Sequence, residues 1–170
     1  QHARLQGLAL LPLYQALIVD GAWWDFCDDI SGTALAVLLR AHPADMKPVL
    51  RGWARGDALW LRRAAMLVQR RFKLHEIDVP LLYDCITPSL DDARFAGEFF
   101  IRKGMGWALR ERSYQAPDEV RAFCRDHAAH APVLAKARQV VARVVGFVEA
   151  HARAHAQQVA QRGLAVGAAR

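Results

Sequence analysis

The chain has 170 residues, of which 54% are hydrophobic and 24% are charged, and its formal net charge is +6. This length suits one domain with a sizeable core, and the charge makes an anionic partner plausible. A membrane span is not predicted, because the longest apolar run, residues 8–19, is short and contains Pro12. We expect no signal peptide, and three widely spaced cysteines favour a reducing, cytosolic setting over a disulfide framework.

Helical periodicity dominates the chain, and the sequence shows no convincing alternation of apolar and polar residues of the kind that marks strands. In chain order, the pattern predicts helices over residues 4–19, 23–32, 33–41, 45–55, 59–73, 76–86, 98–114 and 117–127, then a long Ala-rich helix from 132 past 155. Residues 89–97 are predicted to form a polar loop. Short helices joined by tight turns indicate an all-α bundle or a stacked solenoid, with residues 1–163 as one domain and 164–170 as a frayed tail.

Glycine and proline set most of the expected boundaries. The pair Ser31-Gly32 is predicted to end the second helix, and His42-Pro43 the third, because a residue before proline is pushed out of the helical region. The helix that starts near Glu76 is expected to stop before Pro88. Pro117 is well placed at the first turn of its own helix.

The segment Trp23-Trp24-Asp25-Phe26-Cys27-Asp28-Asp29-Ile30 places two tryptophans directly before three carboxylates. On a helix, Trp24 and Asp28 would lie on the same face, four residues apart. A flat π-surface beside a carboxylate suits a cation or a transition state that becomes cationic. In the alternative interpretation, the tryptophans pack into the core and the aspartates occupy a first helical turn, where negative charge is favoured.

A helix over residues 59–73 would combine a buried stripe with a basic face. The stripe is formed by Leu61, Ala65, Val68 and Phe72. The basic face gathers four cations, namely Arg62, Arg63, Arg70 and Lys73. This face is either simply solvated or binds phosphate, since arginine offers bidentate contacts to phosphate oxygens.

A second basic cluster lies within residues 98–111. Here Lys103, Trp107 and Arg110 fall on one face, which makes this tryptophan a candidate for exposure. The opposite face can supply the core with Ile101, Met105, Ala108 and Leu109. Gly104 and Gly106 each cost a helix about 1 kcal/mol relative to alanine, so we expect close approach of another helix or of a ligand there.

Other chemistry has little support in the sequence. The pairs His127/His130 and His151/His155 show no third ligand beside them, so no metal site is predicted, and no cofactor is expected. The sequence contains no Gly-rich phosphate loop, HExxH or GxSxG motif. Nucleotide hydrolysis, metalloprotease and serine hydrolase activities therefore have no support.

Taken together, these stretches resemble the AlkD-like DNA alkylation repair enzymes, which are DNA glycosylases built from HEAT-like helical repeats. The order and spacing of the motifs agree over residues 13–137, apart from a short insertion around residues 90–97. The likeness is carried by Trp23-Trp24-Asp25 with Asp28, Trp53, Trp60-Leu61-Arg62-Arg63-Ala64-Ala65, Glu98-Phe99-Phe100-Ile101-Arg102-Lys103-Gly104-Met105-Gly106-Trp107-Ala108-Leu109-Arg110-Glu111, Pro117 and Val120. The resemblance implies an all-α fold of HEAT-like repeats, that is, an α–α superhelix or solenoid.

Members of that family excise positively charged N-alkylated purines, such as 3-methyladenine and 7-methylguanine, from duplex DNA. The resemblance implies that Asp28 is the catalytic carboxylate and that Trp24 and Trp107 contact the deoxyribose that bears the lesion. It also implies that Arg63 holds the DNA backbone beside the lesion. Weaker phosphate contacts are expected from Arg62, Arg70, Lys73, Lys103 and Arg110.

The resemblance further implies a monomeric enzyme of base-excision repair in the bacterial cytosol or nucleoid, whose partner is duplex DNA with alkylated bases and not a membrane. Two alternatives remain open. One is a non-catalytic repeat module that binds damaged or branched DNA, and the other is a scaffold that binds protein. Salt separates these two, because affinity through several phosphates falls steeply with added salt.

Overall fold

The computed structural model describes residues 7–130 and, beyond them, the single positions 134, 139, 142, 143, 146, 147 and 150. Apart from these positions, three predictions lie outside the described residues: the Ala-rich helix from 132 onward with its pair His151/His155, the end of the domain at 163, and the tail 164–170. Within the part that is described, no helix is both long and apolar enough to cross a membrane.

The described chain is helical and contains no strand, so the prediction of an all-α fold is confirmed. The longer helices are α1 (Leu11–Gly21), α2 (Trp24–Ile30), α3 (Ala36–Ala41), α4 (Pro43–Arg55), α5 (Leu59–Leu67), α6 (Val79–Asp91), α7 (Ala93–Ala96), α8 (Phe99–Ser113) and α9 (Pro117–Asp126). A π-helical turn, η3 (Ser31–Leu35), joins α2 to α3, and short 3-10 turns cover Leu8–Leu10, Leu74–Glu76 and Ala128–His130.

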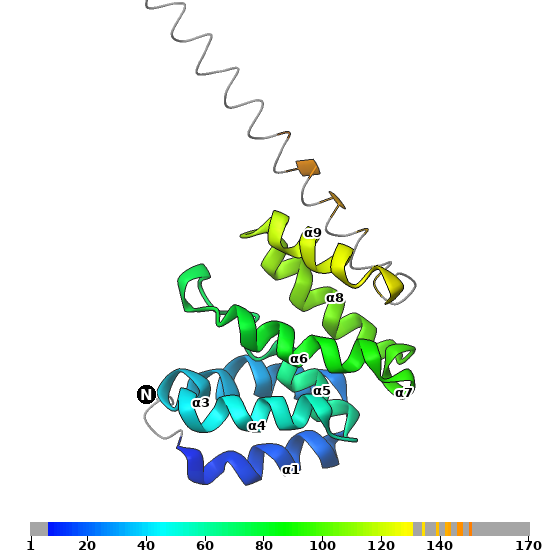
Figure 1. The fold of residues 1–170 in the computed structure, drawn as a ribbon. Helices are drawn as coiled ribbons and strands as arrows, with labels where there is room; N and C mark the ends of the chain where they lie inside the picture. Colours follow the sequence, from blue (N-terminus) through cyan, green and yellow to red (C-terminus); the bar gives the residue numbers. More distant parts are fainter. Residues whose placement is uncertain are drawn as a thin grey trace, which may run out of the picture.

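The helices are stacked roughly in chain order, from α1 at one end to α8 and α9 at the other (Figure 1). Helix α5 lies in the middle of this stack and contacts α1, α2, α4, α6 and α8. This arrangement is a helical-repeat fold, as predicted. Its consequence for the site is that side chains from α5 can reach both α2 and α8.

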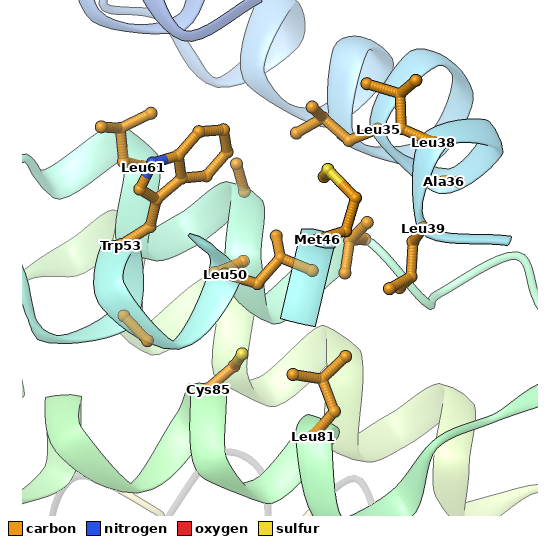
Figure 2. Packing of buried hydrophobic residues seen from close by; sticks show 14 of the residues in the cluster. Leu35, Ala36, Leu38, Leu39, Met46, Leu50, Trp53, Leu61, Leu81 and Cys85 are labelled. Carbon is orange, nitrogen blue, oxygen red and sulfur yellow. The ribbon is translucent and has the colours of Figure 1, made fainter. Parts of the chain in front are cut away.

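Two apolar clusters hold the stack together, and α5 contributes to both. The first joins α1 through α6. Figure 2 shows Met46 and Leu50 of α4 between Leu35 of η3 and Leu81 of α6, and Trp53 of α4 beside Leu61 of α5. The second joins α5 to α9 and includes Met105 of α8. Full burial of a side chain of this size contributes about 2 kcal/mol. Two cores that share α5 therefore fix the spacing of the helices around it.

Ser31-Gly32 does not end a helix, contrary to the prediction. Backbone torsions stay helical from α2 through η3 into α3. The Ser31 hydroxyl donates to the Asp28 carbonyl oxygen at 3.1 Å. A Cβ atom at Gly32 would lie 3.0 Å from Nη2 of Arg70. The glycine therefore makes room for an arginine, and π turns of this kind are frequent at functional sites.

Helix α5 ends at Leu67, earlier than the predicted residue 73. The chain turns over residues 68–71, and the Gln69 side chain holds this turn through hydrogen bonds to the backbone N–H (2.7 Å) and carbonyl (3.0 Å) of Asp78. The predicted stripe of Leu61, Ala65, Val68 and Phe72 is nevertheless buried. The predicted basic face is wrong, because Arg70 and Lys73 lie beyond the helix.

Proline does not stop α6, which continues past Pro88 to Asp91. Ser89 and Leu90 are buried, and this packing outweighs the amide that the proline lacks. The expected polar loop over residues 89–97 therefore contains the end of α6 and all of α7. The carboxylate of Asp92 caps α7 by accepting from the backbone N–H of Arg94 at 3.1 Å.

Candidate active site

A pocket of about 450 Å³ is lined by residues of α2, α5 and α8. Six residues that the sequence singled out line it together: Trp24, Asp28, Arg63, Lys103, Trp107 and Arg110. The fold thus brings into one cavity side chains that are up to 86 positions apart in the chain (110 − 24). The segment around Trp24 and the middle of α8 face each other because α5 packs against both.

Asp28 supplies a buried carboxylate to this pocket, with its side chain 6% exposed. Arg63 binds it in a bidentate ion pair, with Nε 2.8 Å from Oδ1 and Nη2 2.7 Å from Oδ2. Bidentate pairing fixes the orientation of the carboxylate. Each carboxylate oxygen can accept a further hydrogen bond, so the pair leaves acceptor capacity for a ligand or a water molecule.

Arg63 is itself enclosed, at 4% side-chain exposure, and its Nη1 donates to the carbonyl oxygen of Phe100 on α8. Gly104 permits this approach, because a Cβ atom there would lie 3.2 Å from Nη1. The expectation of close approach at Gly104 is therefore confirmed. Arg63 lines the pocket, yet its Nε and Nη2 are committed to Asp28, so its main partner in this structure is a carboxylate.

Trp24 and Trp107 present aromatic surface to the same pocket. Trp24 is 42% exposed. Trp107 is half-buried, and its indole Nε1 donates to Oε1 of Glu111 at 3.0 Å. The Arg70 guanidinium lies 4.5 Å from the centre of the Trp107 ring. The Arg110 guanidinium lies 5.7 Å from the centre of the same ring. Trp107 is thus less exposed than its place on a basic helix face predicted, and three neighbours hold its orientation.

Further aromatic rings continue the wall of the pocket. Phe99 and Phe100 line it, and their rings meet edge to face at 5.2 Å. Trp23 contacts Phe100 at 6.1 Å, and both Trp23 and Phe99 are more than half exposed. The sequence did not assign a role to Phe99, although it lies four residues before Lys103 and eight before Trp107. Extending that spacing by one helical turn would have placed it on the pocket face.

Positive side chains surround the mouth of the pocket. Arg102 and Lys103 are exposed, and Arg110 is half-buried. Arg102 was not among the predicted site residues. Arg110 forms an ion pair with Glu111 at 3.2 Å. With the Asp28 carboxylate also paired, to Arg63, the charges of Arg102 and Lys103 leave this pocket lining net positive, which suits phosphate groups.

Three of the predicted phosphate contacts, Arg62, Arg70 and Lys73, do not line this pocket. Arg62 is 2% exposed and donates from Nε to the carbonyl of Gly56 at 2.6 Å and from Nη2 to Asp92 at 2.9 Å. A guanidinium enclosed in this way packs α5 against the end of α6, and the prediction that it binds DNA phosphate does not fit the structure. Lys73 is exposed beyond α5, does not line the pocket, and stays a prediction.

The described cysteines and histidines show no sign of a metal centre. No three His, Cys, Asp or Glu side chains converge among the residues that the structure describes. His127 shares a hydrogen bond with the Phe123 carbonyl, and His130 lies 3.2 Å from Asp91. Burial raises the pKa of the Cys27 and Cys85 thiols to about 12 each, so neither is a nucleophile at neutral pH.

A model of the DNA alkylation repair enzyme family matches residues 1–140. The chain belongs to this family. The match extends from α1 through α9, so it includes the pocket and all its lining residues. A search of curated proteins found no match. Membership in the family assigns the protein to the repair of alkylated DNA.

Proposed function

We propose that this protein is a DNA glycosylase that hydrolyses the N-glycosidic bond of cationic alkylated purines in duplex DNA. One observation carries the proposal: the carboxylate of Asp28, oriented by Arg63, lines the same pocket as Trp24 and Trp107. A carboxylate and two indole faces form a site for a positive charge.

The reaction needs this kind of site. An alkylated purine such as 7-methylguanine is already a cationic leaving group, so it departs with the electron pair of the glycosidic bond without general-acid help. The barrier is the oxocarbenium-like sugar, as in other glycoside cleavages. Asp28 is suited to stabilise this cation, to orient a water molecule toward C1′ and to accept the proton that the water loses. The faces of Trp24 and Trp107 add cation–π attraction.

The rim of the pocket suits the DNA backbone. Arg102, Lys103 and Arg110 carry their charges around a cavity whose aromatic wall is partly exposed. Contacts to phosphates position a duplex without reading its sequence. A repair enzyme that meets lesions in any sequence context needs this type of binding. In this proposal Lys103 and Arg110 keep the phosphate-binding role that the sequence predicted for them.

The test is release of 7-methylguanine from methylated duplex DNA by the parent and by Asp28→Asn. The variant keeps the shape of the side chain but removes its charge, and we expect release to fall roughly a hundredfold, the scale of one well-placed electrostatic contact. Binding to the same duplex should persist in the variant. A folded parent that binds the duplex and releases no base would contradict the proposal.

One feature favours the second candidate, a non-catalytic module that binds damaged or branched DNA. Both oxygens of Asp28 already accept hydrogen bonds from Arg63, so the negative charge in the pocket is compensated. In such a module, the ion pair would serve only to hold α2 against α5. Binding of alkylated duplex without base release, equal in the parent and in Asp28→Asn, would identify it.

A further inference from the structure

Arg70 lies just beyond the end of α5, and its guanidinium reaches two elements that face each other across the pocket. Its Nη2 donates to the backbone carbonyl of Asp28 at 2.9 Å. Its guanidinium carbon lies 4.5 Å from the centre of the Trp107 ring. One side chain therefore contacts both the residue with the pocket carboxylate and one of the two pocket tryptophans.

The local structure is shaped to admit this arginine. A Cβ atom at Gly32 would lie 3.0 Å from Nη2 and 3.1 Å from Nε of Arg70. A larger residue at position 32 of the π turn η3 would therefore displace the guanidinium. The same carbonyl of Asp28 also accepts from the Ser31 hydroxyl. The π turn and its glycine thus leave space for the Arg70 guanidinium next to the backbone of Asp28.

Placing the Arg70 guanidinium in this half-buried position costs free energy, because it removes water from a charged group. Burial lowers the pKa of Arg70, and the neighbouring charge of Arg71 adds to that effect. The Nε atom of Arg70 is buried and finds no acceptor among the described residues. Arg70 is half-buried and does not line the pocket of Asp28 and Trp107; it lines a separate, smaller cavity together with Glu111 and Arg112. Because these effects are unfavourable, the contacts that Arg70 makes with Asp28 and Trp107 should have a role that offsets them.

We infer that Arg70 is a positioning residue of the glycosylase reaction, which fixes the Asp28 main chain and the plane of Trp107 relative to each other. This inference rests on the function proposed above. It replaces the phosphate contact that the sequence predicted for Arg70. A shift of a reacting group by a fraction of an ångström is enough to slow a reaction severalfold, so a loss of this contact should be visible in the rate.

The experiment compares Arg70→Met, Arg70→Lys and the matched control Arg71→Met. Arg71 is the next residue in the same turn, is exposed, and carries the same charge. Two quantities are measured: the single-turnover rate of 7-methylguanine release at saturating enzyme, and the slope of log affinity for the duplex against log salt. We expect Arg70→Met to lower the rate roughly tenfold or more with an unchanged slope. Arg70→Lys should recover part of the rate, and Arg71→Met should keep all of it.

A phosphate contact would give the opposite pattern, namely a slope smaller by about 0.9 in Arg70→Met and an unchanged rate for bound DNA. That result, or an unchanged rate with an unchanged slope, would overturn the inference. A parent that releases no base would overturn the glycosylase proposal instead. In that case the indole N–H resonance of Trp107 still decides whether Arg70 holds the ring, because it should shift in Arg70→Met and stay in place in Arg71→Met.

Discussion

Two adjacent arginines on α5, Arg62 and Arg63, each form an ion pair with an aspartate, and the two pairs have different surroundings. Arg62 pairs with Asp92 at 2.9 Å, and its guanidinium lies 3.9 Å from the centre of the Phe95 ring. Arg63 pairs with Asp28 at 2.7 Å. The side chains of the two arginines are 2% and 4% exposed. The chemistry of the two pairs is the same, and only the second one lies in the pocket.

The difference lies in what surrounds each aspartate. Asp92 caps α7 and also binds the exposed Arg94. The remaining donors of Arg62 go to the backbone carbonyls of Gly56, Arg55 and Pro88 and to the Ser89 hydroxyl. This pair therefore serves as a clamp between helices. Asp28 instead adjoins a cavity with aromatic walls, where its remaining lone pairs are available. An ion pair becomes a candidate for chemistry through its surroundings.

The largest contrast is expected between Arg63→Met and Arg62→Met. Arg63→Met leaves the buried Asp28 carboxylate without its partner and should lower the free energy of unfolding by about 3 kcal/mol. Arg62→Met should destabilise the fold less, because Asp92 is partly exposed and keeps its ion pair with Arg94. Only Arg63→Met releases Asp28 from its fixed orientation, and we expect it to slow base release roughly a hundredfold. Chemical denaturation gives the stabilities, and single-turnover release at a temperature where both variants are folded gives the rates. Equal losses of rate in the two variants would contradict the proposal that only the Arg63–Asp28 pair takes part in base release.

Salt dependence sharpens the comparison at the surface. Lys103 stands at the pocket rim, whereas Arg94, with a 64% exposed side chain, stands beside the Arg62 pair. If DNA lies across the pocket, Lys103→Met should reduce the slope of log affinity against log salt by about 0.9, the share of one phosphate. Arg94→Met should leave the slope unchanged. Fluorescence titration of a labelled duplex at several salt concentrations measures both slopes. A reduced slope for Arg94→Met alone would mean that DNA binds the surface around Arg94 and not the pocket, which would contradict the proposal.

The smallest effect is expected from two glycine substitutions. Gly104→Ala places a Cβ atom 3.2 Å from Arg63 Nη1, so the guanidinium must shift slightly. Gly56→Ala, beside Arg62, meets only ordinary contacts of 3.5 Å and longer. We expect base release to fall about threefold in Gly104→Ala and to stay unchanged in Gly56→Ala. Single-turnover rates measure both, and a parent-like rate in Gly104→Ala would mean that Arg63 has more freedom than its contacts indicate.

Much of the fold could be predicted from local patterns. The apolar stripe predicted within residues 59–73 and the core face of α8, formed by Ile101, Met105, Ala108 and Leu109, are buried as predicted. Helix α9 begins at Pro117, again as predicted. These features depend on helical periodicity and on the position of proline, which a sequence displays directly.

The failures share a different cause, since each depends on contacts between distant segments. The end of α5 is held by Gln69 against Asp78, and α6 continues past Pro88 because Leu90 is buried. Local rules for proline and helix length cannot anticipate such packing.

The same limit applies within the pocket. Its six predicted lining residues could be found from motifs, because each has a chemically distinctive side chain. The Asp28–Arg63 ion pair joins residues 35 positions apart, and the hydrogen bond from Arg70 to the Asp28 carbonyl joins residues 42 positions apart. Spacing along one helix does not reveal such contacts. The sequence could therefore name the participants of the site but not their pairing.

The most direct test of the central claim is the single-turnover rate of 7-methylguanine release by Asp28→Asn and Asp92→Asn side by side. Both variants remove the carboxylate charge from an arginine–aspartate pair whose arginine lies on helix α5. If the pocket carboxylate performs the chemistry, Asp28→Asn loses about a hundredfold in rate, and Asp92→Asn, once folded, releases base like the parent. Release by Asp28→Asn at the parental rate would contradict a catalytic role for Asp28.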